Sequence, residues 1–241
     1  MRKTRKEDVG ALTRRQTLTG TVATLGVALA LGSSGRAEAK ARMAGAPKVC
    51  ILTPEAMQGP FYFDPKLVRA DITEGKPGAP LALTLQVVEA ETCAKLAGAR
   101  VDIWHSDGLG VYSGYARQAT GSTEGETFLR GTQFTDAEGE VRFATIYPGW
   151  YPGRTPHIHF KVILEEMDLA TGQLYFPDTL TERIYATLSP YRERKEERDT
   201  MNANDFIFQK QGGAHTLVDV AEEGGAHLAI LVIGIDRSRR S

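Results

Sequence analysis

Two histidines and a tyrosine lie close together in the run Tyr151-Pro152-Gly153-Arg154-Thr155-Pro156-His157-Ile158-His159. The His-x-His spacing in a strand-like run places both imidazoles on one face, because side chains alternate at period two. Two neutral imidazoles on one side of a sheet form half of a metal site. Tyr151, across a Pro-Gly turn, could supply an anionic oxygen. A phenolate ligand favours a hard, highly charged ion, and ferric iron is the leading candidate.

The elements that must position these side chains read as short strands separated by turns. Strands are expected at residues 81–88, 99–105, 140–146, 156–164 and 228–235. Turn signals at 106–108 follow the run 99–105, and turn signals at 136–139 precede the run 140–146. Because no helical pattern separates these runs, the sequence predicts an all-β domain, a sandwich or a barrel.

The run 190–198 is the exception, since its charges are compatible with one exposed helix or with a loop. We assign it no chemistry. A Gly/Pro-rich stretch at 75–80 reads as a connector. It divides an N-terminal arm, residues 40–80, from a β-sandwich domain expected at residues 81–241.

Residues 1–39 read as an export signal of the twin-arginine type. Arg14 and Arg15 precede a mildly apolar stretch at 18–31, and Ala37-Glu38-Ala39 has the small-x-small pattern of a cleavage site. An ordinary secretory signal and an uncleaved anchor are the alternatives. The sequence thus predicts an exported bacterial protein, periplasmic or extracellular, with no membrane attachment after cleavage.

The charge balance argues against a nucleic-acid partner. Removing residues 1–39 leaves 22 basic and 27 acidic residues, a formal charge of −5, whereas nucleic-acid binding usually needs a basic face. Cys50 and Cys93 are the only cysteines, and an even count in an exported protein predicts one disulfide between them. Two unpaired buried thiols are the alternative.

Three segments, in this order, resemble one enzyme family. They are Gln58-Gly59-Pro60-Phe61-Tyr62, the run from Val101 to Ser113 that contains Gly110-Val111-Tyr112, and the run from Arg130 to His159. Together they resemble the intradiol ring-cleavage dioxygenases, the family of protocatechuate and catechol dioxygenases. The resemblance covers nearly all of the chain after residue 39. It implies the antiparallel β-sandwich of that family, with few short helices.

The resemblance also implies a non-haem Fe(III) cofactor and the residues of its site. The ligands would be Tyr112, Tyr151, His157 and His159. Arg154 would lie beside the bound substrate, and Gly59, Pro60 and Phe61 would line the pocket for the aromatic ring. Tyr151 would leave the metal and accept a proton when a catechol binds, while Arg154 would stabilise negative charge on the substrate.

The implied reaction cleaves a catecholic ring between its two hydroxylated carbons with O2 and yields a muconate-type diacid. The implied partners are therefore a catecholic small molecule and O2, and the family often forms homo-oligomers. Only six positions separate Tyr151 from His157, fewer than in protocatechuate dioxygenases, which leaves open the choice among catechols.

Two other functions are compatible with parts of the pattern. An exported β-sandwich could bind aromatics or a protein without turnover, and the His pair could serve a zinc or copper enzyme. Two tyrosines make zinc a poor choice, because zinc prefers His, Cys and carboxylate. The remaining histidines are expected to have no catalytic role, His105 as a structural residue and His215 and His227 as solvated ones.

Overall fold

The computed structural model describes residues 50–118 and 121–238, and strands make up most of its regular structure. The expected export signal at 1–39 lies outside the described residues. In chain order the elements are β1 (Pro80–Glu89), β2 (Arg100–Trp104), β3 (Arg130–Phe134), β4 (Glu140–Ile146), β5 (His157–Leu164), β6 (Met167–Tyr175), α2 (Asp178–Thr187), η1 (Tyr191–Glu193), α3 (Phe206–Lys210), η2 (Gly213–Thr216), β7 (Asp219–Glu223) and β8 (Ala226–Ile235).

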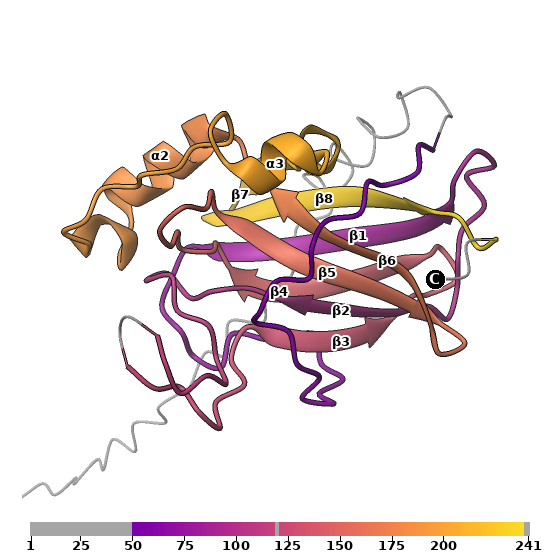
Figure 1. The fold of residues 1–241 in the computed structure, drawn as a ribbon, viewed down its shortest axis with the longest axis horizontal. Helices are drawn as coiled ribbons and strands as arrows, with labels where there is room; N and C mark the ends of the chain where they lie inside the picture. Colours follow the sequence, from indigo (N-terminus) through magenta and orange to yellow (C-terminus); the bar gives the residue numbers. More distant parts are fainter. Residues whose placement is uncertain (1–49, 119–120, 239–241) are drawn as a thin grey trace, which may run out of the picture. The chain divides into compact units, whose positions relative to one another are not determined.

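The strands form two four-stranded sheets, ordered β4-β1-β8-β7 and β3-β2-β5-β6 (Figure 1). Neighbouring strands are antiparallel except β1 and β8, which pair in parallel. Alternate residues of β1, including Leu81, Leu83 and Leu85, are buried, as period-two alternation requires of a strand with one core face. These side chains join Ile103, Ile158 and others in one apolar core. The predicted β-sandwich is therefore confirmed.

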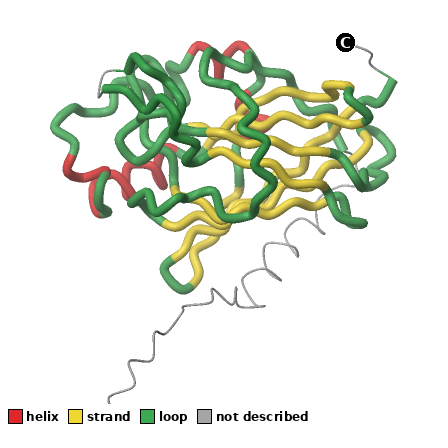
Figure 2. Tube along the Cα trace, turned by 90° about the horizontal axis from the view of Figure 1, so that it is seen from below, coloured by secondary structure: helices red, strands yellow, loops and turns green. Residues whose placement is uncertain are grey.

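The helices and longer loops gather towards one end of the strands (Figure 2). Within the charged run 190–198, η1 forms a short turn and the Tyr191 side chain is buried, its hydroxyl donating to the Tyr147 carbonyl at 2.6 Å. Part of this run is thus anchored in the core. No helix among the described residues is long and apolar enough to cross a membrane.

The described part of the N-terminal arm, residues 50–79, runs along the sandwich and pairs with both sheets. Leu52 forms a bridge with Gly234 of β8, and Val68 forms one with Thr132 of β3. Cys50 and Cys93 form a disulfide with a Cα–Cα distance of 5.3 Å, which ties the arm to the loop after β1. The predicted pairing of these two cysteines is present in the structure.

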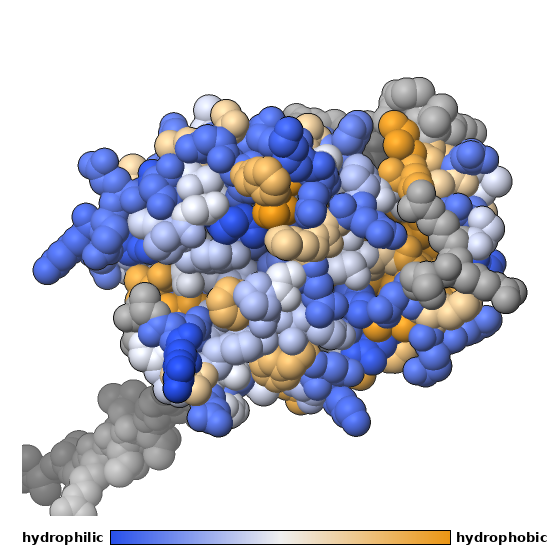
Figure 3. All heavy atoms as spheres, viewed as in Figure 1, coloured by the Kyte–Doolittle hydropathy of each residue, from blue (hydrophilic) through white to orange (hydrophobic). Residues whose placement is uncertain are grey.

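The surface is mainly hydrophilic on the face in Figure 3, with smaller hydrophobic areas between the polar ones. His215 is exposed, as expected. The expectation for His227 was wrong. It lies in β8, where its backbone pairs with both β1 and β7, and its side chain is buried with Nδ1 3.3 Å from the Pro80 carbonyl. Its Gly-rich neighbours form only the preceding turn.

Candidate metal centre

The register of β5 places both histidines of the His-x-His pair on the face of its sheet that points away from the sandwich core. Ile158, between them, belongs to the core. His159 pairs with Trp104 of β2 on one side and with Gln173 of β6 on the other, and His157 pairs with Tyr175. Residues directly opposite one another on paired strands share a face. The His159 ring accordingly stacks on the Trp104 indole, with centroids 4.8 Å apart.

This outer face is buried because the N-terminal arm crosses it. Ala56 donates to the Thr171 carbonyl of β6 at 2.9 Å, and the Tyr62 hydroxyl donates to Asp102 of β2. Between these anchors, the Phe61 ring stacks on Tyr112 with centroids 4.4 Å apart. Gly59 lies against His159, since a Cβ added to it would stand 3.4 Å from the His159 Cε1 atom. The arm segment that the sequence associates with a pocket is therefore in contact with the histidine and tyrosine side chains.

Tyr112 reaches the same place from the loop after β2. Gly110 adopts a positive φ of 84°, and a Cβ there would stand 2.1 Å from the Trp150 carbonyl oxygen, so only glycine fits this turn. Gln118 supports the loop by accepting from the Tyr112 backbone N–H and donating to the Tyr112 carbonyl. The turn after Gly110 thus directs the phenol of Tyr112 inwards, where it is 1% exposed.

The four side chains expected to bind metal converge. The Tyr151 hydroxyl lies 3.1 Å from Nε2 of His157. Ring centroids are 5.7 Å apart for Tyr112 and Tyr151, 4.8 Å for His157 and His159, and 6.3 Å for Tyr112 and His159. Both histidines are 2% exposed. Two phenols and two imidazoles from three separate chain segments therefore share one buried space.

Burial decides the protonation of these groups. Burial, followed by the positive charge of Arg154, lowers the pKa of His157 to about 3. Burial and then His157 hold the pKa of His159 well below 6.5. Burial raises the pKa of Tyr112 and of Tyr151, although Arg154 acts in the opposite direction on both phenols. Both imidazoles are thus neutral at pH 7 and have lone pairs available. The phenols need a nearby cation to ionise.

One unsatisfied atom tests whether these residues fit a metal ion. The Tyr112 hydroxyl is buried, and although the Tyr151 hydroxyl is its neighbour, no group among the described residues makes a hydrogen bond of normal geometry with it. A buried polar group without a partner costs free energy, and such groups are rare in folded proteins. Across the described residues no group of three or more His, Cys, Asp or Glu side chains is placed to hold a metal. A metal held here must therefore use the tyrosines, and two phenol oxygens with two imidazoles suit a ferric ion.

Arg154 lies at the edge of this group, within a network that the sequence did not predict. Its Nε donates to Asp205 at 2.9 Å, and its Nη2 donates to the Gln173 side-chain oxygen. Its Nη1 lies 3.5 Å from the Tyr151 hydroxyl. Asp205 precedes the apolar run Phe206-Ile207-Phe208, and this pattern could have identified it as a helix N-cap but not as a partner of Arg154.

A second arginine beside the site, the buried Arg130 at the start of β3, was also missed. Its guanidinium donates to the Ser113 side chain and backbone and to the Phe61 carbonyl. These three hydrogen-bond acceptors are all neutral groups, and burial lowers the pKa of Arg130 to about 10. Arg130 thus ties the Phe61 arm to the loop that carries Tyr112.

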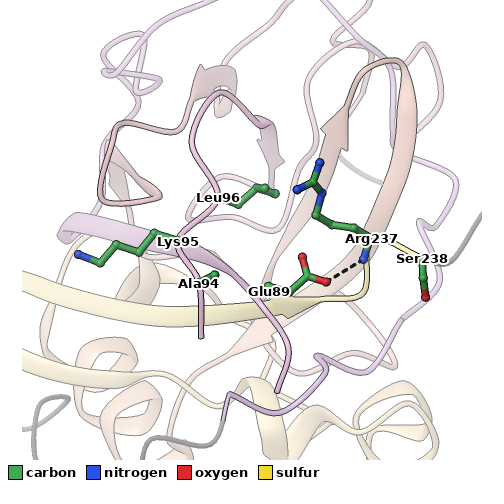
Figure 4. Close-up of a pocket in the computed structure, with 6 residues that line it drawn as sticks. All are labelled: Glu89, Ala94, Lys95, Leu96, Arg237 and Ser238. Carbon is green, nitrogen blue, oxygen red and sulfur yellow. Dashed lines mark hydrogen bonds between the residues drawn. The ribbon is translucent and has the colours of Figure 1, made fainter. Parts of the chain in front are cut away.

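A separate pocket lies beside the loop after β1 and contains none of these residues. It is lined by Glu89, Ala94, Lys95, Leu96, Arg237 and Ser238 (Figure 4). A hydrogen bond from the Arg237 backbone N–H to the Glu89 carboxylate crosses it. Lys95 is paired with Glu138, so this pocket offers no cluster of uncompensated charge.

Comparison with known proteins places the chain in a family. A family model described as "Dioxygenase" matches residues 57–184. A solved intradiol ring-cleavage dioxygenase from Tetranychus urticae is 33% identical with a TM-score of 0.73, covering 80% of this chain and 98% of that one. The chain therefore belongs to the intradiol ring-cleavage dioxygenase family.

Bacterial relatives match over a smaller part of their length. Chlorocatechol 1,2-dioxygenase of Pseudomonas putida is 28% identical over 145 residues, which is 50% of this chain and 52% of that protein. The protocatechuate 3,4-dioxygenase beta chain of Burkholderia cepacia is 32% identical over 128 residues, 49% of this chain and 53% of that protein. The chain thus spans about half the length of the curated relatives it matches.

Proposed function

We propose that this protein is a non-haem Fe(III) intradiol dioxygenase. It would cleave a catecholic ring between the two hydroxylated carbons with O2 and release a muconate-type diacid. The observation that carries the proposal is the convergence of a buried phenol, Tyr112, a half-buried phenol, Tyr151, and two neutral imidazoles, with the Tyr112 hydroxyl left without a hydrogen bond of normal geometry. Membership of the dioxygenase family supports the same reading.

The metal ligands would be Tyr112, Tyr151, His157 and His159. The tautomer of His157 supports its assignment, because its Nδ1 lies 2.7 Å from the Thr155 carbonyl, which only accepts hydrogen bonds. Nδ1 therefore carries the proton, and the lone pair of Nε2 points into the site. A ferric ion bound there would withdraw electron density from a catecholate and so prepare a ring carbon for reaction with O2.

The chain's own residues have separate tasks in this reaction. Tyr151 is the ligand we expect to give way to the substrate, and its oxygen would then accept one catechol proton. Before that step Arg154 Nη1, 3.5 Å from this oxygen, would stabilise the phenolate form. Arg154 would also stabilise the negative charge that develops on the substrate, because the bonds to Asp205 and Gln173 hold its half-buried guanidinium in place. Phe61 and Gly59 form the arm side of the ring pocket.

The alternative functions explain less. A binding protein without turnover would account for the sandwich and its aromatic residues, but not for four potential ligands around a phenol with no partner. A zinc enzyme would need His, Cys or carboxylate donors, and the described residues offer no group of three such side chains. We also propose that the protein acts outside the cytoplasm, which the Cys50–Cys93 disulfide supports.

The test combines metal analysis with turnover. Purified full-length protein is loaded with iron, and the iron content, visible spectrum and oxygen uptake are measured with catechol, protocatechuate, hydroxyquinol and chlorocatechol. We expect about one iron per chain, a visible band from tyrosinate bound to ferric iron, and oxygen uptake with at least one catechol. A colourless protein that retains zinc, or that binds no iron on loading, would overturn the proposal.

A further inference from the structure

The three nitrogen atoms of the Arg154 guanidinium have different neighbours. Nε donates to Asp205 Oδ2 at 2.9 Å, and Nη2 donates to the Gln173 side-chain oxygen. Nη1 lies 3.5 Å from the Tyr151 hydroxyl and 3.4 Å from His157 Nε2. The bonds to Asp205 and Gln173 therefore hold the planar group so that its Nη1 edge faces the tyrosine and histidine.

Asp205 does more than hold Arg154. The Oδ2 atom that accepts from Arg154 also accepts from the Thr155 backbone N–H at 2.8 Å. The Thr155 carbonyl is in turn the partner of His157 Nδ1. One carboxylate oxygen thus fixes the guanidinium and also the peptide segment that selects the His157 tautomer.

The carboxylate is itself firmly placed. Asp205 is 0% exposed, and its Oδ1 caps α3 by accepting from the Phe208 N–H at 2.9 Å. Nearby, the Asn202 side chain accepts from the Thr155 hydroxyl and donates to the Phe176 carbonyl, both at 2.8 Å. Although burial opposes ionisation, the Phe208 N–H and Arg154 keep the pKa of Asp205 below its ordinary value.

Helix capping alone does not account for this arrangement. An N-cap aspartate needs only the bond from Phe208 to fulfil that role, and a helix as short as α3 does not need a buried charge. Burying a carboxylate is costly unless it is paired and hydrogen-bonded. The second oxygen, Oδ2, accepts both of its hydrogen bonds from the loop that carries Arg154 and Thr155. Asp205 lies 51 positions after Arg154 and outside the family match at 57–184.

We propose that Asp205 is a positioning residue for the reaction, which holds the Arg154 guanidinium edge towards Tyr151 and His157. This inference rests on the proposed function. It extends the active site into the segment 205–211, which follows the part of the chain matched by the family model. A second contact of that segment supports this extent, since the Gln211 side chain accepts from the Met57 N–H of the arm at 2.7 Å.

A double-mutant cycle tests the proposal in the iron-loaded protein. The variants are Asp205→Asn, Arg154→Gln and the double variant, with Asp199→Asn as the matched control. In the wild type, the N–H groups of Arg154, Thr155 and Phe208 donate to the two carboxylate oxygens of Asp205. The asparagine amide has the same size but only one oxygen to accept these bonds. Asp199 lies six positions before Asp205, outside the proposed site, and accepts from the Gly153 N–H at 3.2 Å, but it is exposed and has no hydrogen bond to Arg154.

We expect Asp205→Asn to lower kcat by roughly 10- to 100-fold with a smaller change in KM. Arg154→Gln should lower kcat by about 100- to 1,000-fold. The double variant should stay within about threefold of Arg154→Gln, because Asp205 acts mainly through that arginine and its bond to the Thr155 N–H adds a smaller effect. Asp199→Asn should remain within about twofold of the wild type. The visible band of the resting protein and the shift caused by catechol without O2 should change in Asp205→Asn but not in the control.

Losses that multiply in the double variant would overturn the inference, as would an Asp205→Asn protein whose thermal midpoint falls while kcat and the visible band stay unchanged. Failure of the proposed function looks different, because iron-loaded wild-type protein would then cleave no catechol. In that event the affinity for catechol without O2 is measured for the wild type and the three variants instead of kcat. Equal affinities in Asp205→Asn and wild type would then reject a positioning role.

Discussion

Nδ1 of His157 lies 2.7 Å from the carbonyl oxygen of Thr155, two residues earlier in the chain. Because the two residues are so close in the chain, the loop before β5 selects the tautomer of His157, the first residue of that strand. Because the carbonyl can only accept, Nε2 of His157 is left with its lone pair facing the Tyr151 hydroxyl at 3.1 Å. The Tyr151 oxygen and the His157 nitrogen therefore lie close enough together to bind one metal ion in place of the hydrogen bond between them.

Changing Tyr151→Phe should weaken and shift the visible band of the iron-loaded protein and lower kcat by about 10- to 100-fold, because one phenol oxygen is lost. Absorption spectroscopy and oxygen uptake measure the two effects. The matched control is Tyr185→Phe, which removes the hydroxyl of a half-buried tyrosine that donates to the Pro148 carbonyl at 2.8 Å. This control should cost about 1 kcal/mol of stability and leave the spectrum unchanged. An unaltered spectrum in Tyr151→Phe would remove that residue from the ligand set.

Gly59→Ala should impair catalysis through contact with His159. Gly59 has a φ of +71°, and its added Cβ would stand 3.4 Å from His159 Cε1. Gly75→Ala is the matched control, since Gly75 has a φ of +74° with nothing within 4 Å of the added Cβ. Both changes should cost about 1 kcal/mol in urea unfolding, owing to the left-handed backbone. Only Gly59→Ala should change kcat/KM and the visible band, and equal kinetic effects in the two variants would contradict the contact.

Acid should destabilise the protein partly through His105, which is fully buried between the Ser106 carbonyl and the Thr145 hydroxyl. Burial lowers the pKa of His105 to about 4 from 6.5 in the unfolded chain. The unfolded state therefore binds more protons between these values, so this stabilisation is complete above pH 6.5 and is lost as pH falls through 4.

Urea unfolding at pH 7 and pH 4 measures the contribution of His105 to the free energy of unfolding. The stability advantage of wild type over His105→Gln should shrink by about 3 kcal/mol between the two pH values. His215→Gln, at an exposed position, should show the wild-type dependence. A His105→Gln protein that loses as much stability as the wild type on acidification would argue against a neutral buried imidazole.

The disulfide should contribute measurably to stability, because Cys50 and Cys93 close a loop with a sequence separation of 43. Loop-closure entropy for that length corresponds to about 4 kcal/mol. The double variant Cys50→Ser/Cys93→Ser should be destabilised by up to that amount in urea unfolding. A thiol assay on the denatured, unreduced wild-type protein should find no free thiol, and two free thiols would contradict the bridge.

Local patterns predicted several elements well because their causes are local. Alternation of apolar and polar residues marked β1, β4, β5 and β8 within two residues of their observed ends. β6 was missed, since Met167–Tyr175 carries few apolar residues at alternate positions, and α2 was missed because Asp178–Thr187 has a weak apolar stripe with only three buried residues. The contacts that hold these two elements in place come from elsewhere in the chain.

The sequence by itself determined the donor types, their order along the chain and the sharing of one face by His157 and His159, because strand alternation and turn chemistry act over a few residues. Only the tertiary structure decided that Phe61 stacks on Tyr112 and that Asp205 meets Arg154 from 51 positions away. The physical reason is that these contacts join segments that no local period relates. They form only when the sheets, the arm and the segment around α3 pack together and exclude water from the same space.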